Sequence, residues 1–244
     1  MKRILAFMCA IFMTGCMINL NVPPANVANQ AVAQKFDIKQ AHKSVASVFV
    51  KQIGGVGEAS GTAFAIDKDH LITAGHVCVA FAELQDMGIA GENIGLSIVR
   101  DGFKSTLGGV EILEIDEPHD ACLLKKKDHG LVPLEFVTDY DKNVKFGDKV
   151  YIIGAPLGFM VAWQEGHIMD VNSQKRRPLK DKLIITAAAA GGNSGSPILN
   201  EDGKVIGILV MGDSDFDHLS VCVKSSVVQR FLRLIGWPPA KEDY

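Results

Sequence analysis

Gly192-Asn193-Ser194-Gly195-Ser196-Pro197 is the most informative segment of this 244-residue chain. Glycines on both sides of Ser194 let the backbone turn sharply, so that the serine hydroxyl projects from the turn. The backbone amides of Gly192, Asn193 and Ser194 would then line an oxyanion hole, with Gly192 and Ser194 converging on one point. Taken alone, the hexapeptide fits a simple tight turn equally well. The rest of the chain has to decide between the two interpretations.

A histidine and an aspartate far upstream of this turn are suitable partners for a nucleophilic serine. His76 follows the apolar run Leu71-Ile72-Thr73-Ala74-Gly75, and Asp120 precedes the apolar run Ala121–Leu124. A carboxylate at the head of an apolar strand is partly buried and needs a partner, for which an imidazole N–H is suitable. The order His76, Asp120, Ser194 is that of chymotrypsin-type folds and differs from subtilisins and α/β-hydrolases. We expect Ser194 to be the nucleophile, His76 the general base, and Asp120 the residue that orients the histidine.

Short β-rich segments separated by turn residues fill most of the remaining chain, and they are too closely spaced for βαβ units. The first group is 46–51, 62–67, 70–73, 94–99, 110–115 and 121–125, and the second is 149–153, 163–171, 182–186, 197–200, 204–210 and 220–223. These groups predict an all-β fold of two six-stranded antiparallel β-barrels, at about residues 37–136 and 137–224. A C-terminal helix at 225–235 is expected to pack its apolar stripe onto the second barrel.

Several stretches together resemble the trypsin-like superfamily, and within it the bacterial HtrA/DegP peptidases. They are Ser60-Gly61-Thr62-Ala63-Phe64, the run from Thr73 to His76, Asp120 to Leu124, Gly147-Asp148-Lys149-Val150, Gly154-Ala155-Pro156-Leu157-Gly158, the Ser194 hexapeptide, and Gly203-Lys204-Val205-Ile206-Gly207. The resemblance covers about residues 45–235. It implies a serine endopeptidase that needs no cofactor, acts on protein or peptide substrates, and is compatible with a homo-oligomer.

The chain departs from the HtrA pattern in two places. Ser196 stands where a second glycine is common, a small change that should preserve the oxyanion hole. We expect no PDZ module after residue 235, because too few residues follow. A catalytically idle trypsin-fold module, acting as a binding protein or holdase chaperone at the cell envelope, remains the alternative function. An esterase that uses the same residues is a weaker alternative.

The primary specificity pocket is expected at Ala188, Ala189, Leu209, Val210 and Met211. The run Ala187–Ala190 precedes the nucleophile and offers no carboxylate that would select Lys or Arg. We therefore expect cleavage after small or medium aliphatic residues. The aspartates Asp213, Asp215 and Asp217 in the following loop weigh against this expectation, although a solvated turn explains them better.

The N-terminus is typical of an exported protein. Residues 1–16 combine Lys2 and Arg3 with a short apolar run and end in Cys16, which resembles a bacterial lipoprotein signal. We expect lipid attachment at Cys16, a flexible tether at 17–36, the peptidase domain at 37–236, and a tail at 237–244. The predicted location is the cell envelope, attached to a membrane at the periplasm or cell surface. A plain secreted protein remains the alternative.

The cysteines and the charged residues give no support for a metal site or for nucleic-acid binding. Buried free thiols are the favoured state of Cys78, Cys122 and Cys222, although a bridge between the first two remains open. A zinc site from His76, Cys78, His119 and Cys122 lacks the usual ligand spacing, so we expect no metal. The net charge is −3, and the basic runs at 125–127 and 175–177 lack interleaved aromatic residues, so we expect no nucleic-acid partner.

Overall fold

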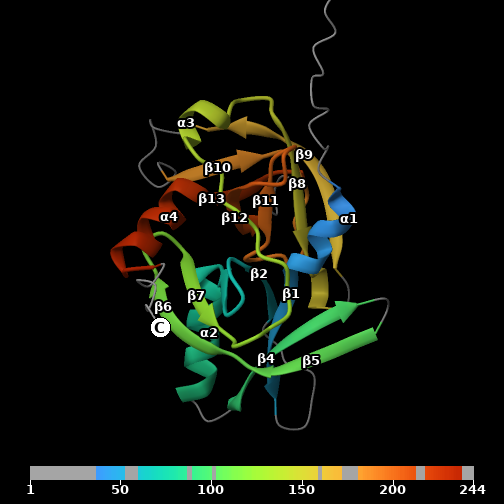
Figure 1. The fold of residues 1–244 in the computed structure, drawn as a ribbon, viewed down its shortest axis with the longest axis vertical. Helices are drawn as coiled ribbons and strands as arrows, with labels where there is room; N and C mark the ends of the chain where they lie inside the picture. Colours follow the sequence, from blue (N-terminus) through green and yellow to red (C-terminus); the bar gives the residue numbers. More distant parts are fainter. Residues whose placement is uncertain are drawn as a thin grey trace, which may run out of the picture. The chain divides into compact units, whose positions relative to one another are not determined.

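Antiparallel strands form both halves of the domain in this computed structural model, which describes residues 37–52, 60–86, 90–100, 103–158, 161–171, 181–212 and 218–237 (Figure 1). The first half is a seven-stranded sheet in the order β5-β4-β1-β2-β3-β7-β6. Its strands are β1 (Val45–Gln52), β2 (Ser60–Ala65), β3 (His70–Thr73), β4 (Ala90–Arg100), β5 (Phe103–Gly109), β6 (Glu111–Asp116) and β7 (Ala121–Lys125).

The second half is a closed six-stranded barrel in the order β10-β13-β12-β11-β8-β9. Its strands are β8 (Lys149–Gly154), β9 (Ala162–Asp170), β10 (Lys182–Ile185), β11 (Pro197–Leu199), β12 (Val205–Gly212) and β13 (Ser220–Lys224). The predicted all-β class, with antiparallel pairing and a six-stranded second barrel, is confirmed.

The first half differs from the prediction of a six-stranded barrel, because it forms a seven-stranded sheet with β5 and β6 at its two edges. The additional strand, β5, pairs antiparallel with β4 from Arg100↔Phe103 to Gly95↔Gly109. Its sequence, Phe-Lys-Ser-Thr-Leu-Gly-Gly, is rich in polar residues and glycine, and therefore gives no clear apolar alternation. β5 lies at the edge of the sheet, where pairing with one neighbour is sufficient to form a strand.

Six short or longer helical segments complete the described chain: α1 (Ile38–Ala41), η1 (His42–Ser44), α2 (Gly75–Asp86), α3 (Tyr140–Asn143), η2 (Pro156–Gly158) and α4 (Ser225–Leu234). The predicted C-terminal helix corresponds to α4, which packs against β12 and β13 as expected (Figure 1). The side chains of Val227, Val228, Phe231 and Leu232 are buried there. No helix of the described segments is long and apolar enough to cross a membrane.

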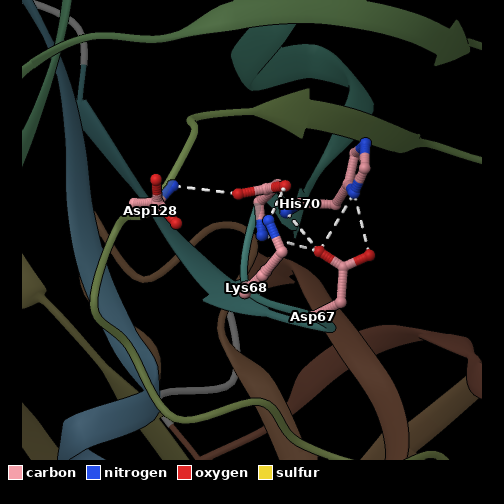
Figure 2. A network of polar contacts seen from close by, with 5 residues as sticks. Asp67, Lys68, His70 and Asp128 are labelled. Carbon is pink, nitrogen blue, oxygen red and sulfur yellow. Dashed lines mark hydrogen bonds and ion pairs between the residues drawn. The ribbon is translucent and has the colours of Figure 1, made fainter. Parts of the chain in front are cut away.

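The carboxylates of Asp67 and Asp69 hold the turn between β2 and β3 (Figure 2). The Asp67 carboxylate accepts hydrogen bonds from the backbone N–H of Asp69 and of His70, both at 2.7 Å, and contacts His70 Nδ1 at 2.8 Å. Asp69 in turn accepts from the Asp128 N–H at 2.9 Å, and its other oxygen pairs with Lys68 at 2.6 Å. These contacts connect the start of β3 to the chain that follows β7.

A disulfide joins Cys78 of α2 to Cys122 of β7, with a Cα–Cα distance of 6.5 Å. The favoured expectation of free thiols is therefore wrong for these two residues, and it is correct for the buried Cys222. Cys122 pairs with Thr73 across the β3–β7 ladder. Because α2 begins only two residues after Thr73, its first turn lies against β7, which brings the two cysteines together.

The N-terminal signal, Cys16 and the tether at 17–36 lie outside the described residues, as does most of the tail. Those predictions therefore remain predictions.

The buried imidazole of His129 should make folding depend on pH. The residue is 2% exposed, its Nδ1 accepts the Leu131 N–H at 3.1 Å, and its Nε2 has no hydrogen-bond partner within the described ranges. Burial is the main cause that lowers its pKa. The unfolded chain therefore binds a proton more readily, so this contribution to stability is present above about pH 6.5 and is lost below it.

We expect His129→Asn to reduce the fall in the free energy of unfolding between about pH 7 and pH 5. The asparagine oxygen can accept the same Leu131 N–H but does not titrate. Urea denaturation at a series of pH values measures the slope. An unchanged slope in the variant would show that other groups carry the acid sensitivity.

Candidate active site

His76 and Asp120 form a hydrogen-bonded pair where α2 begins and β7 begins. The imidazole Nδ1 lies 3.0 Å from Oδ1 and 3.1 Å from Oδ2 of the carboxylate, and the His76 backbone N–H donates to Oδ1 at 2.8 Å. Burial would raise the pKa of Asp120, but the hydrogen bonds from His76 outweigh burial and keep that pKa below its usual value. An ionised carboxylate can only accept, so Nδ1 donates to it, and Nε2 is the ring nitrogen left available for another partner.

The backbone on both sides of this pair is tightly constrained. A Cβ atom on Gly75 would lie 2.9 Å from the Ala121 amide nitrogen and 3.1 Å from the Asp120 Cα, so only glycine allows this close approach. Asp120 has a φ of 62°, a left-handed conformation that aspartate tolerates better than most residues. Such a conformation costs on the order of 1 kcal/mol. The two hydrogen bonds to His76 act in the opposite direction and stabilise it.

Charged side chains surround His119, the residue that precedes Asp120. His119 Nδ1 lies 2.8 Å from Asp116 Oδ1, and Arg230 Nη2 lies 3.2 Å from His119 Nε2. Lys182 Nζ donates to the His119 carbonyl at 3.4 Å. Burial lowers the pKa of Lys182, while neighbouring carboxylates, Asp120 first among them, act in the opposite direction. This cluster connects the β6–β7 turn to β10 and α4.

The Ser194 segment is a series of tight turns in which Gly192 and Gly195 both have a φ of 90°. The Gly191 carbonyl accepts from the Leu157 N–H at 2.7 Å, and the Asn193 carbonyl accepts from the Ser196 N–H at 2.9 Å. The C=O and N–H of a trans peptide point in opposite directions. These bonds therefore orient the Gly192 and Ser194 amides away from their carbonyl partners.

The three predicted oxyanion amides differ in their availability. Neither the Gly192 nor the Ser194 amide donates to an acceptor within the described part of the chain. The Asn193 amide donates to the Ala190 carbonyl at 3.0 Å and is not free to bind a substrate. Of the three, only Gly192 and Ser194 could therefore bind an oxyanion.

Thr62 of β2 links the first-half sheet to the Ser194 segment. Its backbone N–H donates to the Ser194 carbonyl at 2.7 Å, and its hydroxyl donates to the Gly192 carbonyl at 2.8 Å. The same hydroxyl accepts from the Ala155 N–H at 2.9 Å. Thr62 is fully buried, so these three hydrogen bonds are shielded from water.

Gly195 brings the Ser194 segment close to the chain that leads into His76. A Cβ atom on Gly195 would lie 2.1 Å from the Thr62 carbonyl oxygen and 2.9 Å from the Ala74 amide nitrogen. Ser194 and His76 thus each lie within two residues of this contact. No hydrogen bond connects the Ser194 hydroxyl to His76 among the described contacts. In ligand-free enzymes such bonds are often long and tighten only when substrate binds.

The predicted specificity-pocket residues fall into two groups. Leu209 and Val210 are buried in the hydrophobic core, whereas Met211 is 61% exposed and Ala188 is half-buried. Ala189 is also half-buried, and a Cβ atom on Gly212 would lie 3.2 Å from its Cβ. Only the two alanines and the methionine therefore present side chains to solvent. The aspartates at 213, 215 and 217 lie outside the described residues.

The structure adds contacts that sequence reasoning missed. Thr62 lies in a motif noted above, but nothing in the sequence indicates its bonds to a segment 130 residues away. In the sequence, Lys182 and Arg230 look like ordinary surface residues of a strand and a helix. For the zinc site considered above, both cysteines are engaged in the disulfide, and the described residues contain no group of His, Cys, Asp and Glu that could hold a metal.

Comparison with known proteins identifies the family to which this chain belongs. The chain belongs to the trypsin-like peptidase family, because the family model described as a trypsin-like peptidase domain matches residues 61–208. The resemblance to HtrA/DegP peptidases within this family is confirmed by curated relatives. A probable periplasmic serine endoprotease, DegP-like, of Chlamydia pneumoniae is 28% identical over 178 residues, covering 70% of this chain and 33% of the relative.

The magnetosome formation protease MamE of Paramagnetospirillum magneticum is 30% identical over 162 residues, covering 62% of this chain and 22% of the relative. The chain thus spans between about a fifth and a third of the length of these relatives. Among solved structures, Deg5 matches with a TM-score of 0.65 at 22% identity, covering 83% of this chain and 93% of that one. The serine endoprotease from Yersinia pestis matches with a TM-score of 0.64 at 18% identity, covering 81% and 64%. These structural matches support the fold.

Replacing Thr62 by valine should destabilise the domain. Thr62→Val is nearly isosteric but leaves the Gly192 carbonyl and the Ala155 N–H buried without partners. An unsatisfied buried polar group costs about 1–3 kcal/mol, so we expect a loss of this size in the free energy of unfolding by urea denaturation. Thr62→Ser keeps the hydroxyl and is the matched control. A valine variant as stable as the serine variant would show that the hydroxyl bonds contribute little.

Proposed function

We propose that this chain is a serine endopeptidase in which Ser194, His76 and Asp120 form the catalytic triad. The observation that carries the proposal is the His76–Asp120 pair, in which the carboxylate engages Nδ1 and leaves Nε2 available to a serine hydroxyl. Gly195 brings the serine turn against the same region of the chain. A base, an orienting carboxylate and a serine on a tight glycine turn together suit acyl transfer.

In the proposed reaction, the Ser194 hydroxyl oxygen attacks a peptide carbonyl as His76 Nε2 takes the hydroxyl proton. The oxyanion of the tetrahedral intermediate accepts from the Gly192 and Ser194 amides. His76 then gives its proton to the leaving amine, and the acyl group stays on Ser194. A water molecule, deprotonated by His76, hydrolyses this ester and regenerates the serine. Asp120 holds the ring in the required tautomer throughout.

Exposed apolar side chains near the serine turn suit an extended protein substrate. Leu157, whose N–H bonds to Gly191, is 65% exposed, and Met211 is 61% exposed. Met211 follows Leu209, whose carbonyl accepts from the Gly195 N–H at 2.7 Å. Apolar groups on either side of a turn favour segments that a folded protein would bury. We therefore infer that unfolded or envelope proteins are the substrates.

We infer an envelope location from two facts. Relatives of the DegP-like group are named periplasmic, and the Cys78–Cys122 disulfide persists only in an oxidising compartment. Membrane attachment through a lipid on Cys16 is part of this proposal. Assembly into a homo-oligomer is compatible with it.

A catalytically idle binding module or holdase is the second candidate function. It would account for the fact that, among the described residues, no hydrogen bond joins the Ser194 hydroxyl to His76, although substrate binding could also form that bond. Hydrolysis and substrate retention by the same protein separate the two functions.

We expect the full-length protein to hydrolyse unfolded casein through Ser194. Ser194→Ala should abolish the activity, and Asp120→Asn should lower kcat roughly 10⁴-fold because the wrong tautomer is then stabilised. Fluorescence release from labelled casein measures both effects. Casein that is bound but never cut, equally by wild type and Ser194→Ala, would favour the holdase.

The residue on the acyl side of the cut should be small or medium aliphatic, because Ala188 and Ala189 offer no carboxylate to a basic side chain. Digestion of a mixed peptide library, read by mass spectrometry, gives the preference directly. Ala189→Asp is expected to shift cleavage toward Lys and Arg. Dominant cleavage after Lys or Arg by the wild type would overturn the assignment of this pocket.

A further inference from the structure

We infer that the Cys78–Cys122 disulfide positions the His76–Asp120 pair for catalysis. The disulfide and this pair join the same two elements, α2 and β7 with its preceding turn. Cys78 lies two residues after His76, and Cys122 lies two residues after Asp120. Both connections therefore span the same sequence separation, 44 residues. This inference rests on the proposed peptidase function.

The two connections hold opposite sides of the first turn of α2. Successive helical residues are about 100° apart, so two residues place His76 and Cys78 about 200° apart around the helix axis. In agreement, the His76 side chain is 46% exposed, whereas Cys78 is fully buried. A bond on the buried side and hydrogen bonds on the exposed side together oppose rotation of this turn. A rotation would move the imidazole relative to the carboxylate.

The hydrogen bonds alone are poorly suited to fix the geometry. His76 is nearly half exposed, and hydrogen bonds open to solvent contribute little because water competes for both partners. Asp120 also sits in a left-handed conformation that other backbone geometries would relieve. The chain between the two residues leaves the site to form β4, which pairs with β1, and β5, which pairs with β4. A covalent bond next to both residues removes this freedom.

Thiol–disulfide chemistry within the described residues is confined to this bond. Cys222 is the free cysteine there, it is fully buried, and burial raises its pKa so that it stays an unreactive thiol. Reduction of the disulfide by a phosphine in water gives two thiols and one phosphine oxide. We expect that product to keep its strands but to lose the fixed His76–Asp120 geometry.

The test compares the oxidised full-length wild type with Cys78→Ala/Cys122→Ala, and uses Cys222→Ala as the matched control for loss of a buried sulfur. Two quantities are read: kcat and KM on a peptide substrate, and the far-downfield NMR signal of an imidazole N–H bonded to a carboxylate. We expect the double variant to lose the signal and about 10²-fold in kcat, at a nearly unchanged KM. Cys222→Ala should keep both.

A folded double variant that retains the signal and the wild-type kcat would overturn the inference and leave the disulfide a purely stabilising bond. If the wild type shows the signal without hydrolysis, and the double variant loses the signal, the peptidase proposal fails while the positioning role stands. If the double variant does not fold, the NMR signal and circular dichroism of the wild type are followed during phosphine reduction in stabilising sulfate. An NMR signal that persists until the strands unfold would then overturn the inference that the disulfide positions the pair.

Discussion

The buried hydroxyl of Thr62 is the contact on which the geometry of the serine turn depends. It donates to one backbone carbonyl and accepts from one backbone amide, both from the second half of the chain, while its own N–H bonds to the Ser194 carbonyl. The glycines in the turn have wide conformational freedom, so the turn cannot define its own shape. A group from the other half of the domain has to define it. In the dry interior these bonds are strong, and breaking one leaves an unsatisfied group.

Backbone strain is concentrated at the same place. The described residues include four non-glycine residues with positive φ, and two of them, Asp120 and Leu157, adjoin the site. The other two, Asp128 and Asp139, are aspartates in turns, a residue type that tolerates this conformation. Leu157 has no such tolerance, and its N–H bonds to the Gly191 carbonyl, which orients the Gly192 amide. The strain is thus located where it aligns groups, and the surrounding bonds offset its cost of on the order of 1 kcal/mol per residue.

The sequence predicts the second barrel well because its strands are short apolar runs bounded by glycine, proline and asparagine. Each expected strand there agrees with the structure within two residues. In the first half, β5 escaped prediction because it is polar, and α2 escaped because Gly-His-Val-Cys-Val-Ala-Phe-Ala has almost no polar face to reveal a helical period. Residue types and chain order were enough to nominate His76, Asp120 and Ser194. The contacts that orient these three residues could not be predicted from the sequence.

Those contacts are long-range, which explains why no local pattern revealed them. Thr62 and Gly192 are 130 residues apart, His119 and Arg230 are 111 apart, and the disulfide spans 44. Local patterns report on helices and strands, whereas such pairs form only after the elements have docked. A chain in which only the first half has folded could hold His76 against Asp120, but the Ser194 turn would lack its Thr62 bonds. The arrangement of the Ser194 turn is therefore completed only when the two halves dock, because its Thr62 bonds join residues of both.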